Sequence, residues 1–262
     1  MTRAPVRIMV APIVFGIAVL ALWQLAVLVF NIQPFVLPGP VNIGTQFGQV
    51  WPIIWAGIVV TGGNALIGFA LGSVVGIIGA VVSALLRPFD ELTQPVVTIV
   101  GVIPLVALAP ILYGMYGADA ETSRQLIAAL AVFVPVYLNT LRGLRQVKPV
   151  HRDLMRAYAA TPWQSTRTVT LPGALPFVFT GLRIASSLAV ISALIAEYFG
   201  GPVDGLATSI TSSAAGSNYT LAYAFVLGAI LLGLVFYCVT LAMEKFATRH
   251  SPLPPTRPAV GR

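Results

Sequence analysis

The stretch GIVVTGGNALIGFALGSVVGIIGAVVSALL, residues 57–86, contains no charged side chain. About 20 such residues suffice to cross the hydrocarbon core of a bilayer. Lipid offers the backbone no hydrogen-bond partner, so a spanning segment must be a helix or belong to a closed barrel. A barrel would show short segments of alternating polarity, whereas this stretch is continuously apolar. The sequence therefore predicts a membrane-spanning helix here.

The rest of the chain has the same character. Of its 262 residues, 57% are hydrophobic and 9% are charged, against about 25% charged residues in soluble domains. This composition excludes a typical water-soluble enzyme and a disordered chain. A single cysteine, Cys238, excludes an intrachain disulfide. We expect an all-α protein of the cytoplasmic (inner) membrane with several spans.

Proline and glycine residues divide the uncharged stretches into segments. The predicted spans are about residues 8–30, 57–86, 92–115, 125–143, 174–199 and 221–243. We expect residues 1–262 to form one transmembrane domain, with the proline-rich residues 251–262 as a loose tail. The first apolar run is longer than a signal-peptide core and no small-x-small site follows it, so we expect it to be retained.

The basic residues predict the orientation. In the six-span interpretation, all of the 15 Lys and Arg residues except Arg124 and Arg183 fall on one side. Cytoplasmic loops are enriched in Lys and Arg, so both termini are predicted to be cytoplasmic. Arg124 falls on the opposite side and Arg183 inside the fifth span. Topology thus accounts for the net charge of +7, and no nucleic-acid partner is predicted.

The cytoplasmic loop between the fourth and fifth spans covers residues 144–173. A short helix is predicted at about 150–159. Thr161 is a good cap for a second helix, with Pro162 in its first position and Gln164 completing a capping box. Pro172-Gly173 is predicted to end that helix. Two short helices would form a compact knob at the membrane surface; a solvated basic loop and a nucleic-acid-binding helix-turn-helix are the alternatives.

The loop resembles a known motif. Asp153, five residues, Ala159, nine residues, Val169, one residue and Leu171-Pro172 follow the spacing of the EAA loop of ABC-type importer permeases. That loop typically has Glu-Ala-Ala in place of Asp153-Leu154-Met155, and Gly in place of Ala159. Alanine in a turn that favours positive φ costs up to about 1 kcal/mol.

Other segments extend the resemblance over about residues 34–243. Leu37-Pro-Gly-Pro40, Ala160-Thr-Pro-Trp-Gln164, Leu171-Pro-Gly-Ala-Leu-Pro176 and Gly181-Leu-Arg-Ile-Ala185 are similar to the nitrate/sulfonate/taurine-type permease group. The resemblance implies a type I importer bundle that works as a homodimer. It further implies two cytoplasmic ABC ATPase subunits and an extracytoplasmic solute-binding protein as partners, besides the membrane lipid.

In that arrangement the loop docks on the ATPase and couples its closure to transport. The residues implied are Asp153, Leu154, Met155, Arg156, Ala159, Thr161, Leu171 and Pro172. Neither lysine, Lys148 or Lys245, belongs to a phosphate-binding loop. We therefore expect no cofactor, metal site or catalytic residue in this chain, with ATP and Mg²⁺ bound by the partner ATPase.

Two features lie within the spans. Gly68, Gly72 and Gly76 recur at every fourth position of the second span, which favours close helix packing; a moving surface near the translocation path is the alternative. Asn64 in the same row, with Arg183 and Glu197 in the fifth span, are candidates for the path or a gate. Arg183 and Glu197 are separated by a rise of about 21 Å, so we expect no direct pair, and both could instead extend toward opposite membrane interfaces.

The sequence thus predicts the permease subunit of an ATP-driven, binding-protein-dependent importer of a small solute. An ATP-independent secondary transporter or channel is the main alternative. An intramembrane enzyme would need paired catalytic groups at one depth, and no such pair stands out.

Overall fold

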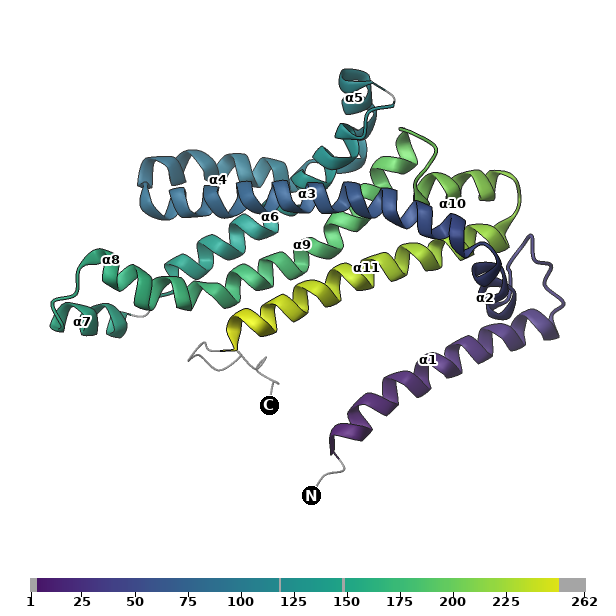
Figure 1. Cartoon of the computed structure of the whole chain (residues 1–262), viewed down its shortest axis with the longest axis horizontal. Coiled ribbons are helices and arrows are strands. Elements are labelled where there is room, and N and C mark those ends of the chain that lie inside the picture. The colour runs from purple at the N-terminus through teal and green to yellow at the C-terminus, as the bar shows by residue number, and fades with distance from the viewer. Residues whose placement is uncertain (1–3, 118, 148, 250–262) are drawn as a thin grey trace. The chain divides into compact units, whose positions relative to one another are not determined.

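The computed structural model of the protein describes residues 4–117, 119–147 and 149–249. Within them the chain is helical and contains no strand, so the prediction of an all-α fold is confirmed. The elements are α1 (Ala4–Val29), α2 (Pro40–Gln49), α3 (Trp51–Leu85), α4 (Arg87–Val102), α5 (Leu105–Tyr116), α6 (Thr122–Arg145), α7 (Pro149–Ala157), α8 (Pro162–Ser165), the π turn η1 (Thr166–Thr170), α9 (Leu171–Phe199), α10 (Leu206–Ala215) and α11 (Tyr219–Thr248) (Figure 1). The predicted tail, residues 251–262, lies outside the described residues.

Long apolar helices dominate the described part of the chain. The helical runs that are long and apolar enough to cross a membrane are Val10–Val29, Trp51–Leu85, Thr122–Arg145, Pro162–Phe199 and Tyr219–Thr248. Helices α4 and α5 pass the same test only as a pair. The described residues therefore hold five candidate spans, or six when that pair counts as one.

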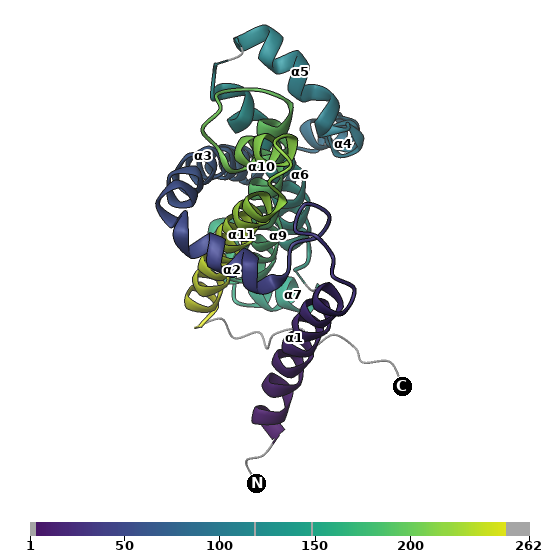
Figure 2. The same ribbon diagram turned by 90° about the vertical axis from the view of Figure 1, so that its right-hand side faces the viewer.

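The third predicted span is broken. The residues predicted as one helix, 92–115, belong to α4 and α5, which are bent by 96° (Figure 1, Figure 2). Ile103 adopts an extended backbone, with ψ of 125°, and Pro104 follows it. A proline disfavours the helical conformation of the residue before it and cannot donate a backbone hydrogen bond. The direction of the chain therefore changes at Pro104.

The chain divides into two compact units. The first contains the residues up to Val60 and Val203–Ile230, which include α1, α2, α10 and the first parts of α3 and α11. The rings of Trp23 and Tyr223 meet edge to face, with centroids 6.3 Å apart. A methyl group added at Gly228 would lie 2.6 Å from Ile54 Cγ2. The beginnings of α3 and α11 therefore pack closely in this unit.

The second unit contains Thr61–Pro202 and the chain from Leu231 onward. Helices α6 and α9 pack along each other in it. Two clusters of buried apolar residues lie between its helices: Ala80, Val97, Tyr137 and Leu141 in one, and Ala109, Tyr113, Ile127 and Ala196 in the other. The first joins α3, α4 and α6, and the second joins α5, α6 and α9. The predicted site residues all lie in this unit.

Glycines bring α3 against α6. A Cβ added at Gly68 would lie 2.7 Å from the Gln125 carbonyl oxygen, and one at Gly72 would lie 2.8 Å from Val132 Cβ. At Gly76 the nearest atom would be the Phe133 carbonyl oxygen, at 3.1 Å. The two backbones therefore approach too closely for larger side chains.

Candidate functional site

The loop after α6 folds into helix α7, which ends in a left-handed turn. The Ala160 N–H donates to the Met155 carbonyl at 3.0 Å, and the Ala159 N–H donates to the Arg156 carbonyl at 2.9 Å. This pair of bonds is a Schellman motif, with Ala159 in its left-handed position at φ +50°. Ala159 therefore has the conformation that the EAA-type spacing reserves for glycine.

Helix α8 begins immediately after that turn. The Gln164 N–H donates to Thr161 Oγ1 at 3.3 Å, and the Thr161 N–H donates to Gln164 Oε1 at 2.8 Å. Pro162 occupies the first turn, where its missing N–H costs nothing. The predicted capping box is confirmed, and it fixes where the second short helix starts.

Pro172-Gly173 does not end that helix, so this prediction was wrong. The helical run continues from Pro162 to Phe199 through η1, where the Leu171 N–H donates to the Thr166 carbonyl five residues earlier. In an uninterrupted α-helix the ring of Pro172 would clash with the Thr168 carbonyl. The wider π turn just before the proline relieves that clash. The loop is therefore joined to the fifth span without a break.

The surface of this segment carries both charge and apolar side chains. We call α7, its left-handed turn and α8 the coupling segment. The Asp153 side chain is 70% exposed and forms a surface ion pair with Arg156, at 3.7 Å. Exposed apolar side chains beside it are Val150, Leu154, Tyr158 and Trp163. Of the other predicted coupling residues, Ala159, Thr161 and Leu171 are exposed, and Met155 and Pro172 are partly buried. The segment thus exposes both charged and apolar side chains on two short, capped helices.

The second predicted feature, Glu197, lies in a buried polar cluster. Its side chain is fully buried and accepts a hydrogen bond from Thr61 Oγ1 at 2.8 Å. Arg124 Nη1 lies 3.9 Å from Glu197 Oε1 and is equally buried. Arg124 also donates to the Pro202 carbonyl, and the Tyr113 hydroxyl donates to the Ala196 carbonyl at 3.2 Å.

This cluster corrects two expectations. Glu197 does not extend to a membrane interface, because Thr61 and Arg124 hold its charge inside the unit. The predicted span 125–143 leaves Arg124 outside the membrane helix, whereas Arg124 lies in the first turn of α6 with a buried side chain. The helical spacing of Thr61, Asn64 and Gly68 is a signal that could have located the cluster, since it places these residues on the α3 face that meets α6.

Asn64 and Arg183 have separate partners. Asn64 Oδ1 accepts a hydrogen bond from Gln125 Nε2 at 3.0 Å, again between α3 and α6. Arg183 Nη1 lies 3.0 Å from Glu244 Oε2 on α11, with both side chains partly buried. Arg183 is therefore neither free to extend to an interface nor paired with Glu197. Among the described residues, no group of His, Cys, Asp and Glu could hold a metal ion.

The sequence was compared with known proteins. Residues 72–250 match the family described as binding-protein-dependent transport system inner membrane component. The riboflavin transport system permease protein RibX of Chloroflexus aurantiacus is 29% identical over 232 residues, covering 88% of this chain and 86% of RibX. The putative aliphatic sulfonates transport permease protein SsuC of Escherichia coli is 30% identical over 193 residues, or 72% of each chain.

Solved structures share the fold. A chain of an amino acid ABC transporter crystallised with histidines has a TM-score of 0.58 at 15% identity, covering 78% of this chain and 94% of that one. A chain of the MetNI methionine ABC transporter, in an inward-facing conformation, has a TM-score of 0.57 at 19% identity, covering 76% and 96%. The protein is thus a multi-pass permease of the inner membrane. It belongs to the family of binding-protein-dependent transport system inner membrane components.

Proposed function

We propose that this chain forms the membrane pathway of an ATP-driven importer together with a second copy of itself. Two cytoplasmic ABC ATPase subunits bind ATP and Mg²⁺, and an extracytoplasmic protein delivers the solute. The chain supplies no nucleotide-binding residues of its own, since neither of its lysines stands in a phosphate-binding loop. Its role is to convert movement of the ATPase into a change of access across the bilayer.

The observation that supports this role best is the build of the coupling segment. It is capped at both of its turns, exposes Leu154, Tyr158 and Trp163, and continues into α9 through η1. Exposed apolar patches rimmed by polar groups are typical of protein interfaces. We infer that the ATPase holds this surface, with Asp153 supplying a negative charge to the contact.

A continuous helix then carries the movement inward. Because no flexible loop separates α8 from α9, a displacement of α8 moves the cytoplasmic end of α9 directly. Glu197 lies near the other end of α9, in contact with α3 and α6. We place the gate at Glu197 and Asn64, whose side chains join α3, α6 and α9. Arg183, partly exposed beside Glu244, is our candidate for contact with the path.

The transported compound is proposed to be a small solute. The relatives are named for riboflavin, aliphatic sulfonates, formylaminopyrimidine, bicarbonate and taurine. The solute-binding protein of this proposed importer should bind one of these compound classes. Calorimetric titration of that protein with riboflavin, taurine, an alkyl sulfonate and bicarbonate would identify which one.

The substitution Asp153→Lys tests the coupling role. It reverses a charge that is 70% exposed, so the chain should insert in the membrane normally. We expect the amount of co-purified ATPase to fall at least tenfold, equivalent to about 1.4 kcal/mol of binding, and ATP-dependent uptake to be lost.

A matched control is Glu91→Lys, which makes the same charge change at a 72% exposed side chain on α4. It should leave both readouts unchanged. Normal ATPase binding and uptake in Asp153→Lys would exclude the coupling role. Uptake by the purified chain alone, insensitive to vanadate, would favour a secondary transporter or channel.

A further inference from the structure

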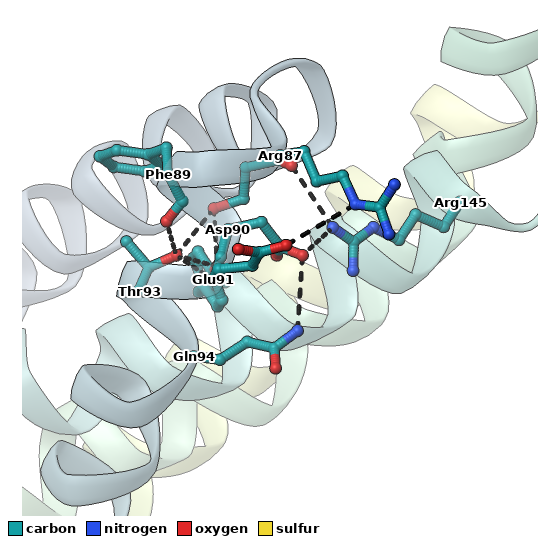
Figure 3. Close-up of polar contacts among 9 residues, drawn as sticks. Arg87, Phe89, Asp90, Glu91, Thr93, Gln94 and Arg145 are labelled. Carbon is teal, nitrogen blue, oxygen red and sulfur yellow. Dashed lines mark hydrogen bonds and ion pairs between the residues drawn. The ribbon is translucent and has the colours of Figure 1, made fainter.

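The cytoplasmic ends of α3, α4 and α6 meet at an ion pair that lies outside both the coupling segment and the Glu197 cluster. Arg145, the last residue of α6, places Nη2 2.7 Å from Asp90 Oδ2 in the first turn of α4 (Figure 3). The same Nη2 donates to the Ser83 carbonyl of α3 at 3.3 Å. A single guanidinium nitrogen thus links the end of α6 to both neighbouring helices.

The carboxylate of this pair depends on Arg145. The Asp90 side chain is only 11% exposed. Gln94 Nε2 reaches Oδ2 at 3.4 Å, a long hydrogen bond, and among the described residues no donor reaches the buried Oδ1. A poorly hydrated charge is held by its opposite charge more strongly than a surface charge is. Arg145 is therefore the main side-chain partner of the Asp90 carboxylate (Figure 3).

Hydroxyl and apolar contacts pack α3, α4 and α6 together beside the pair. The hydroxyl groups of Ser83, Thr93 and Tyr137 lie 2.7–3.1 Å from one another and join α3, α4 and α6. Thr93 Oγ1 also donates to the Phe89 and Asp90 carbonyls, which fixes the first turn of α4 (Figure 3). The apolar cluster of Ala80, Val97, Tyr137 and Leu141 continues this contact. A displacement of Arg145 therefore acts on α3, α4 and α6 together, because these helices are packed on one another.

The position of Arg145 along the chain connects the ion pair to the coupling segment. Helix α6 ends at Arg145 and α7 begins at Pro149, so the coupling segment starts a few residues after the ion pair. A displacement of α7 can therefore reach the bundle through the end of α6 as well as through α8 and α9. At the end of α6 it meets Asp90 and, through it, the start of α4.

We infer that Asp90 and Arg145 are positioning residues for coupling: their ion pair carries the displacement of α7 into the α3–α4 turn. This inference rests on the proposed function, because it needs an ATPase docked on the coupling segment. It adds a second route inward, since α8 reaches α9 directly while α7 reaches α4 through this pair. Neither residue contacts the transported solute or the ATPase in this assignment.

The test uses full-length chains co-expressed with the ATPase and the solute-binding protein of the proposed importer. Variants Asp90→Asn and Arg145→Gln remove the charge of each partner in turn, and Arg145→Lys keeps it. Glu91→Gln is the matched control, because Glu91 also pairs with an arginine on the same turn but is 72% exposed. The readouts are the ATPase content of the purified complex and its ATP hydrolysis with and without the solute-binding protein, per assembled complex.

We expect Asp90→Asn and Arg145→Gln complexes to assemble fully but to lose stimulation by the binding protein at least fivefold, the lower range of coupling between sites. The double variant should be no worse than either single one, since both act through one contact. Arg145→Lys should keep stimulation, because one ammonium group can make both contacts of Nη2. Glu91→Gln should behave as the unaltered chain.

Three results would overturn the inference. They are normal stimulation in Asp90→Asn, multiplied losses in the double variant, and failure of Arg145→Lys to retain stimulation in an assembled complex. Failure of the proposed function would look different. It would be seen in the unaltered chain, as a purified complex that contains no ATPase.

Discussion

The contact between α3 and α6 allows a quantitative test of the fold. A Cβ at Gly72 would lie 2.8 Å from Val132 Cβ and within clashing range of the Ala129 carbonyl, whereas ordinary contacts start at 3.4 Å. Relief of the Val132 contact alone requires the helices to separate by about 0.6 Å, and the closer Ala129 carbonyl requires more. A gap of that size reduces the van der Waals attraction between facing atoms by a quarter to a half. Overpacking of this kind costs about 1–3 kcal/mol of folding free energy.

The same helix supplies its own controls. Gly63 would have no atom within 4 Å of an added Cβ, and Gly76 has an intermediate clearance of 3.1 Å. Alanine is a better helix former than glycine by up to about 1 kcal/mol, so Gly63→Ala should be neutral or stabilising. Among the three variants, Gly63→Ala should be the most stable, Gly76→Ala intermediate and Gly72→Ala the least stable.

Titration of the purified chain from mild detergent into SDS, followed by helicity and tryptophan fluorescence, measures this order. A loss of 1–3 kcal/mol lowers the folded-to-unfolded ratio about 5- to 150-fold. Equal midpoints for Gly72→Ala and Gly63→Ala would refute the close approach of α3 and α6.

Further predictions concern the coupling segment and the buried cluster. Ala159→Gly should slow amide hydrogen exchange in α7, because alanine at φ +50° is disfavoured by about 1 kcal/mol; unchanged or faster exchange would argue against that turn. Thr161→Ala removes a cap worth about 0.5–2 kcal/mol and should speed exchange in α8. Glu197→Gln removes the negative charge 3.9 Å from Arg124 Nη1, and breaking a buried ion pair costs about 3–5 kcal/mol. It should therefore unfold at clearly lower SDS than Thr61→Val; equal midpoints would contradict the ion pair.

Local signals predicted much of this fold. The absence of charge over long stretches was enough to locate the apolar helices, because burial in lipid is decided residue by residue. The capping box at Thr161 was predictable for the same reason, since it depends on neighbours within a few positions, whereas the turn at Ala159 was implied only by the resemblance to the EAA loop. The row from Gly68 to Gly76 indicated close packing, although not that α6 is the partner.

The remaining features depend on residues far apart in the chain. Arg124 resembles a loop cation in sequence, and its burial is explained only by Glu197 and Thr61 on other helices. Arg183 likewise finds its counter-charge at Glu244, near the end of α11. Prolines mark positions where a helix can deviate, but not how. At Pro104 the chain bends by 96°, whereas at Pro172 the helical run continues because a π turn precedes the proline.

That π turn sets the rotational phase between two helices. Each residue of an α-helix advances the chain by 100°, and the turn at Thr166–Thr170 holds one residue more than an α turn would. If Pro172 were replaced by alanine, ordinary α bonding would become possible, and α8 would rotate by about 100° relative to α9. Trp163 would then face another direction while the residues of α9 kept their place. The proline and its π turn thus set the direction in which α8 faces relative to α9.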